Sequence, residues 1–183
     1  MKPLLLALTV ALCACRQEEV TRTRVPKEEG EAPPMASFPA LPAAAPASVR
    51  LRWTVPTGWM ETSGTGMRVA TITPPGPGKA EVTVVALPGD SGGELENANR
   101  WRGQIGLGPT DATGLAASRA AIRTKLGPAS TYSFSAGGSR LVAAVVSYRG
   151  VSWFIKLMGQ EDAVKRAEPG FRALLESVAG PAT

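Results

Sequence analysis

The chain has no histidine among its 183 residues. Histidine is the usual base that takes the proton from a nucleophilic serine, so its absence excludes a Ser-His-Asp triad. Zinc and copper sites also lose their commonest ligand. The sequence contains neither a P-loop nor a G-x-G-x-x-G motif, so it offers no recognisable nucleotide-binding site. We therefore expect a protein that holds no cofactor and is not an enzyme.

Cysteine is almost as scarce, because Cys13 and Cys15 are the only two in the chain. The later part of the chain therefore has no means of forming an internal disulfide. Both cysteines follow a short apolar run, residues 4–12, which is preceded by the single positive charge of Lys2. A bilayer-spanning helix needs about 20 apolar residues. The shorter run is typical of a secretory signal.

The end of this signal, from Leu12 to Cys15, resembles a bacterial lipobox. Ala14 supplies the small residue that precedes the modified cysteine, whereas Cys13 would follow the bulky Leu12. We therefore expect residues 1–14 to be a lipoprotein signal peptide and Cys15 to carry a diacylglycerol. Each buried methylene of such a lipid contributes about 0.8 kcal/mol to membrane binding. The alternative is an ordinary secretory signal cut near Ala14, which would leave a free thiol.

Residues 15–48 are expected to form the lipidated N-terminus and a disordered tether. Proline and alanine dominate this segment, mixed charges lie near its start, and large apolar side chains are few. Such a composition buries too little surface to offset the entropy of ordering the chain. Arg16, rather than Asp, follows the lipidation position. By resemblance to known bacterial sorting rules, this favours the outer membrane.

Residues 49–183 have the patterning of a globular domain. The segment 49–55, VRLRWTV, alternates between apolar and polar residues before Pro56. This alternation predicts a half-buried strand. By the same reasoning we expect further strands at MRVATIT (67–73), AEVTVVAL (80–87), AAIRTKL (120–126) and STYSFS (130–135).

The strongest strand signals are RLVAAVVSY (140–148) and VSWFIKLM (151–158), separated only by Arg149 and Gly150. Two residues are enough for a tight antiparallel hairpin. Parts of both segments are apolar on each face, which predicts a central place in a sheet covered on two sides.

Helical spacing of apolar residues appears in ELENANRWRGQI (94–105) and EDAVKRAEPGFRALLESV (161–178), and a short helix is expected near residues 110–117. Pro169 lies inside the last of these helices, where it would kink the helix or begin a second one. The order of elements predicts an α+β fold, with an antiparallel sheet of about six strands flanked by helices.

Three stretches carry a resemblance to a known family: VRLRWTVPTGW (49–59), PGDSGGELENANRWRGQIGL (88–107) and VSWFIKLMG (151–159). Together they resemble bacterial lipoproteins and domains of the PsbP-like superfamily, over roughly residues 51–178. The resemblance implies an antiparallel sheet flanked by helices and a role in protein binding rather than catalysis. It supplies no catalytic motif that can be placed on this chain.

The string GDSGG (89–93) is the one motif that favours catalysis. It matches the surroundings of the nucleophilic serine in chymotrypsin-like proteases, and it lies between a predicted strand and a predicted helix, as a nucleophile elbow does. An envelope serine hydrolase using Ser91 is therefore the alternative function, with a lysine as the only conceivable base. We expect instead a structural turn, because its three glycines permit positive φ and Ser91 is placed to cap the helix.

A binding surface is harder to locate. The globular part carries 15 basic and 10 acidic residues, which indicates either a basic face toward an acidic partner or a dispersed, solvated surface. Trp59, Arg100, Trp101 and Arg102 are the candidate binding surface, although core packing is an open alternative for both tryptophans. We therefore expect a lipid-anchored envelope protein whose domain binds a protein or ligand without catalysis. Nucleic acid is not an expected partner.

Overall fold

The computed structural model describes residues 49–182. Cys15 and the predicted signal and tether lie outside the described residues. In chain order the elements are β1 (Met60–Ser63), β2 (Arg68–Thr73), β3 (Ala80–Pro88), α1 (Gly93–Gln104), α2 (Ala112–Ser118), β4 (Arg119–Thr124), β5 (Gly127–Ala136), β6 (Ser139–Tyr148), β7 (Val151–Gln160) and α3 (Glu161–Ser177).

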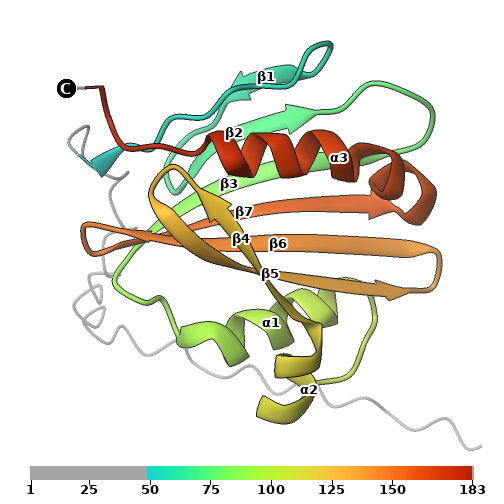
Figure 1. Ribbon diagram of the computed structural model, residues 1–183. Coiled ribbons are helices and arrows are strands. Elements are labelled where there is room, and N and C mark those ends of the chain that lie inside the picture. The colour runs from blue at the N-terminus through green and yellow to red at the C-terminus, as the bar shows by residue number, and fades with distance from the viewer. Residues whose placement is uncertain (1–48, 183) are drawn as a thin grey trace, which may run out of the picture. The chain divides into compact units, whose positions relative to one another are not determined.

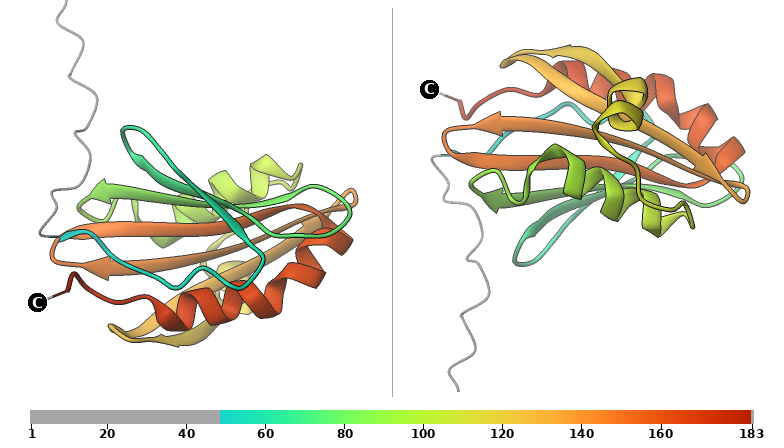
Figure 2. Two further views of the ribbon diagram at one scale, coloured as in Figure 1. Left: turned by 90° about the horizontal axis from the view of Figure 1, so that it is seen from above. Right: turned by 90° about the horizontal axis from the view of Figure 1, so that it is seen from below.

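The strands form one antiparallel sheet of seven strands in the order β1-β2-β3-β7-β6-β5-β4. Helix α3 covers one face of this sheet, and α1 and α2 lie on the other (Figures 1 and 2). The predicted α+β fold is therefore confirmed, with one strand more than expected. Among the described residues, no helix has the length and apolar character needed to cross a membrane.

The β6–β7 hairpin forms the centre of the sheet, as the sequence predicts. Its register runs without interruption from Ser139 opposite Gln160 to Tyr148 opposite Val151. Both turn residues have positive φ, 49° at Arg149 and 75° at Gly150. Two successive positive φ angles are the geometry of a type I′ turn, whose twist matches that of the flanking strands.

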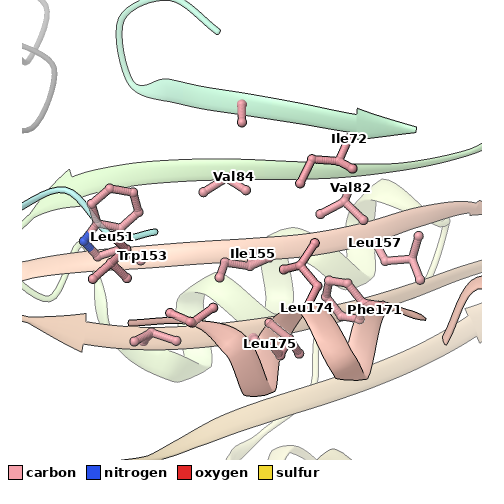
Figure 3. Packing of buried hydrophobic residues seen from close by; sticks show 14 of the residues in the cluster. Leu51, Ile72, Val82, Val84, Trp153, Ile155, Leu157, Phe171, Leu174 and Leu175 are labelled. Atoms are coloured by element: carbon pink, nitrogen blue, oxygen red, sulfur yellow. The ribbon is translucent and has the colours of Figure 1, made fainter. Parts of the chain in front are cut away.

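The larger core lies between the sheet and α3. Helix α3 buries a stripe of apolar side chains that includes Phe171, Leu174 and Leu175, and these meet Ile155 and Val82 of the sheet (Figure 3). Burying a side chain of this size contributes about 1.5–3 kcal/mol. This burial explains why α3 continues past Pro169 as one helix, although a proline removes one intrahelical hydrogen bond.

A second core lies between the sheet and α1. The helix contributes Ala98, Trp101 and Ile105, and the sheet contributes Tyr132 and Phe154, with other buried residues. The first turn of α1 leaves Leu95 only partly buried. The apolar stripe predicted for this helix therefore faces the sheet, as its spacing requires.

The prediction of a strand at residues 49–55 is wrong. Leu51 is buried with 6% exposure, but the backbone pairs only as an isolated bridge between Arg52 and Ala179. The alternation of apolar and polar residues arises because this segment lies along the C-terminal end of the chain and not along a neighbouring strand. The first strand is instead β1, an edge strand whose four residues are all exposed. It therefore carries no apolar alternation that the sequence could reveal.

Candidate functional site

The GDSGG segment is a joint between β3 and α1. Four of its five residues have positive φ: 69° at Gly89, 52° at Ser91, 94° at Gly92 and 75° at Gly93. Glycine adopts such angles at no steric cost, whereas an L-residue is strained there. The expectation of a sharp turn that needs glycine is therefore confirmed.

Ser91 takes part in this turn through its own side chain. Its hydroxyl donates a hydrogen bond to the Pro88 carbonyl at 3.0 Å. A serine that acts as a nucleophile gives its proton to a base, whereas here the acceptor is a backbone amide oxygen. The arrangement is that of a side chain that closes a turn.

The prediction that Ser91 caps α1 is wrong. The N-cap is Gly92 in the left-handed conformation, and it makes no side-chain capping bond. Asn97, which is buried, holds the turn from within the helix instead. Its Nδ2 atom donates to the carbonyls of Ser91, at 3.1 Å, and Gly93, at 2.7 Å.

The structure does not bring the candidate binding residues together. Trp101 is only 5% exposed, and its ring lies 5.9 Å from that of Tyr132. It is a core residue and not a surface anchor, because the stripe that carries it faces the sheet. Trp59 belongs to the opposite face, where it packs against the core beneath α3.

The two candidate arginines serve the structure around α1. Arg102 lies over the ring of Phe134, 5.6 Å from its centroid, and its Nε donates to the Gly108 carbonyl at 2.8 Å. Arg100 is exposed and donates to Asn97 Oδ1 at 3.2 Å. Of the four candidates, Arg100 alone is exposed.

A polar cleft that the sequence did not indicate lies on the α1 face of the sheet. It has a volume of about 600 Å³. Its polar lining consists of Glu94 from the start of α1, Arg119 from β4, Ser130 from β5 and Ser147 from β6. Four alanines, Pro128 and Val145 form the rest. We call this space the Glu94 cleft.

Strand register explains why these side chains meet. Arg119 of β4 lies opposite Tyr132 of β5, and Ser130 of β5 lies opposite Val145 of β6. Side chains two residues apart on a strand share a face, so Arg119, Ser130 and Tyr132 all project to the side that α1 covers. The joint at GDSGG then places Glu94 beside them.

A chain of hydrogen bonds links the polar groups of the Glu94 cleft. Arg119 donates to the Ser130 hydroxyl oxygen twice, from Nε at 2.9 Å and from Nη2 at 2.7 Å. The Ser130 hydroxyl in turn donates to Glu94 Oε1 at 3.4 Å. Arg119 Nη2 is 3.7 Å from the same carboxylate oxygen, and both side chains are about half exposed. Such an exposed ion pair contributes only about 0–1 kcal/mol.

Tyr132 adds a buried hydroxyl behind these groups. The residue is fully buried, and its hydroxyl lies within hydrogen-bonding reach of the Glu94 and Ser130 side chains. Burial, followed by the neighbouring Glu94 side chain, raises the pKa of Tyr132 to about 12.

Two other features of the domain could also bind ligands. Lys156 is half-buried, and burial, with Arg68 as the next cause, lowers the pKa of its ammonium group. Its Nζ donates to Gln104 Oε1 at 2.6 Å, so this hydrogen bond holds the ammonium group against α1. A cleft of about 390 Å³ lies on the other face, where Phe171 and Arg172 of α3 contribute to its lining. Within residues 49–182, no group of three acidic or cysteine side chains is placed to hold a metal ion.

Sequence reasoning missed the Glu94 cleft because its members are far apart in the chain and individually ordinary. A single carboxylate near the start of a helix, such as Glu94, is common because it interacts favourably with the helix dipole. The alternation in STYSFS did indicate that Ser130 and Tyr132 share a face, but it could not identify the strand or helix that they meet.

No family model matches this chain, and no curated protein matches it. Similar solved structures include PsbP (CyanoP) from Synechocystis sp. PCC 6803, which is 14% identical over 81% of this chain and 100% of that chain, with a TM-score of 0.43. LpqN, involved in cell envelope biogenesis of Mycobacterium tuberculosis, is 15% identical over 75% of this chain and 87% of that chain, with a TM-score of 0.45.

A protein from Bacteroides thetaiotaomicron is 8% identical over 75% of this chain, with a TM-score of 0.46, and the match covers only 47% of the Bacteroides chain. The present chain thus spans about half the length of that protein. All three likenesses concern the fold alone. PsbP, after which the superfamily of the resemblance is named, is one of these three proteins.

Proposed function

We propose that this protein is a lipid-anchored protein of the bacterial cell envelope whose globular domain binds a ligand or partner at the Glu94 cleft without catalysis. Cys15, at the end of the lipobox-like sequence, is the proposed anchor, and the outer membrane is the proposed location. Residues 49–183 then form the domain that the tether holds near the membrane surface.

The observation that carries the proposal is the pair of hydrogen bonds from Arg119 to Ser130 Oγ. A hydroxyl oxygen has two lone pairs, and both are engaged by the guanidinium. Ser130 is therefore held as a hydrogen-bonding group of the cleft wall rather than as a nucleophile. With the Ser91 hydroxyl used in its own turn, both serines next to α1 have structural partners.

The envelope location is supported by two considerations. The N-terminal sequence has the positive residue, the apolar run and the small residue before Cys15 that a lipoprotein signal requires. LpqN is described as involved in cell envelope biogenesis, and from that description we extend only the envelope to this chain.

Metabolic labelling tests the anchor. The full chain, expressed in a bacterial host, is grown with an alkyne analogue of palmitate. We expect the wild type and Cys13→Ser to be labelled and Cys15→Ser to be unlabelled. Cys13→Ser is the matched control, because it removes the other cysteine of the same segment. An unlabelled wild type, or equal labelling of Cys15→Ser, would contradict the proposed anchor.

A further inference from the structure

We propose that the Glu94 cleft binds the α-amino acid group, a carbon that carries both a free ammonium and a free carboxylate, with the carboxylate on Arg119 and the ammonium on Glu94. This inference rests on the proposed function, because it names the ligand class of the same cleft. The ligand is either a free amino acid or a larger molecule that displays this group.

Charge balance is the first argument. Among the described residues that line the cleft, Glu94 and Arg119 alone are charged, and they carry opposite charges. A simple anion would be attracted to Arg119 but repelled by the adjacent Glu94 carboxylate. A simple cation would be attracted to Glu94 but repelled by Arg119. A ligand with both charges satisfies both groups.

Spacing is the second argument. Arg119 Nη2 and Glu94 Oε1 are 3.7 Å apart, so two ligand groups that bind them must be near neighbours. The ammonium and carboxylate of an α-amino acid are attached to one carbon and meet this requirement. The termini of an extended dipeptide are separated by the length of an additional residue and do not.

The hydrogen bonding of Arg119 is the third argument. The guanidinium directs both Nε and Nη2 to the neutral hydroxyl of Ser130. This planar pair of donors matches a carboxylate, which binds it more strongly than a hydroxyl does because the bonds are charge-assisted. A ligand carboxylate would therefore displace Ser130 from Arg119.

Tyr132 lies behind the two charged groups of the cleft. It is fully buried, and its hydroxyl is within hydrogen-bonding reach of the Glu94 and Ser130 side chains. Once a ligand carboxylate occupies Arg119, the oxygen of Ser130 is free to accept a hydrogen bond from Tyr132.

The rest of the lining fits a small ligand. Alanines, Pro128 and Val145 leave the cleft wide because their side chains are short. None of the described residues that line it is aromatic, so these residues provide no stacking platform of the kind that a sugar ring commonly uses.

The test measures binding of alanine to the full chain by isothermal titration and by the shift of its melting temperature. N-acetylalanine, which retains only the carboxylate, and alaninamide, which retains only the ammonium, are the ligand controls. We expect alanine at millimolar concentration to bind and to raise the melting temperature. The two controls should bind about ten-fold more weakly or worse, because each lacks one charged pair.

Variants locate the binding. Arg119→Gln and Glu94→Gln should each weaken alanine binding about ten-fold or more. Arg123→Gln is the matched control, since Arg123 is an exposed arginine of the same strand that does not line the cleft. It should bind like the wild type. Tyr132→Phe, which removes only the hydroxyl, should weaken alanine binding while the protein stays folded, as its thermal melt would show.

Three results would overturn the inference: no binding of alanine by the folded wild type, equal binding of N-acetylalanine, or unchanged binding by Arg119→Gln. Failure here is distinguishable from failure of the proposed anchor. Absence of alanine binding in a chain labelled at Cys15 contradicts only the ligand class. Alanine binding by an unlabelled chain contradicts only the anchor.

Discussion

A Cβ atom added at Gly170 would lie 2.7 Å from Cζ2 of Trp59 and 3.1 Å from its Cε2. The indole therefore packs directly on the backbone of α3, at the one residue in that turn that has no side chain. This contact accounts for Trp59, which the sequence left open between the core and a binding groove. It also explains the choice of glycine beside Pro169, in a helix that would otherwise favour alanine.

Gly170→Ala is expected to destabilise the protein even though alanine is the better helix former. The propensity gain is about 1 kcal/mol, whereas overpacking a well-filled contact costs about 1–3 kcal/mol. Gly103→Ala in α1 is the matched control, because nothing lies within 4 Å of its added Cβ, and it should stabilise. Urea denaturation of the two variants measures the difference. If both Gly170→Ala and Gly103→Ala stabilised the protein, the Trp59 indole would be able to move aside at little energetic cost.

The joint at GDSGG should be sensitive to glycine replacement and tolerant of serine replacement. Gly92→Val would impose a side chain on φ of 94°. We expect a loss of about 1–2 kcal/mol from this strain. Gly93→Val, strained by its φ of 75° alone, should lose about 1–2 kcal/mol. Ser91→Ala, which loses one hydrogen bond of a turn, should cost about 1 kcal/mol at most. Thermal melts compare all three, and an equal loss in Ser91→Ala would mean that the serine holds more than its own turn.

Asn99 should be important for the loop that follows α1. Its Nδ2 donates to the Thr110 carbonyl at 3.0 Å, and its Oδ1 accepts from the Thr110 N–H at 2.7 Å. Asn99→Ala removes both bonds and should cost about 1–3 kcal/mol. Asn99→Asp keeps the acceptor and should cost less. Arg100→Ala, on the exposed side of the same helix, should change stability little. Denaturation midpoints that fall in any other order would contradict this assignment.

Tyr132 should make the protein lose stability in strong alkali. Burial raises its folded pKa to about 12 from the ordinary value of 10.0. Between these two values the unfolded chain releases the proton while the folded chain retains it, so folding becomes less favourable as the pH rises. Melting temperatures measured from pH 9 to pH 12 should fall more steeply for the wild type than for Tyr132→Phe. Tyr148→Phe, at the only other tyrosine, should follow the wild type; if it removed the steep fall instead, the assignment to Tyr132 would be wrong.

Local patterns predicted most of the fold. The apolar runs at residues 140–148 and 151–158 identified the central hairpin, because a buried strand must be apolar on both faces. Helical spacing identified α1 and α3, and the glycines of GDSGG identified the joint. β1 was missed because an exposed edge strand has no buried face to impose a pattern. The segment at 49–55 was misassigned because half-burial along a loop produces the same alternation as a strand.

The candidate site could not be predicted in the same way. Arg119, Ser130 and Glu94 come together through strand register and through the position of α1 over the sheet, which are long-range relationships. The basic and aromatic residues that seemed most informative, Trp101 and Arg102, instead hold α1 to the sheet and to its own loop. A tryptophan on an amphipathic helix is buried when it lies on the apolar face and exposed when it lies on the polar face. The neighbouring arginines did not indicate which face Trp101 occupies.

The central claim is that the domain binds without catalysis, and that Ser91 belongs to a turn rather than to an active site. Labelling of the purified full chain with a fluorophosphonate probe tests this most directly, because the probe reacts with activated serines. We predict no labelling above that of the heat-unfolded protein, in the wild type and in Ser91→Ala alike. Specific labelling of the folded wild type that Ser91→Ala abolishes would contradict the claim and identify the protein as a serine hydrolase.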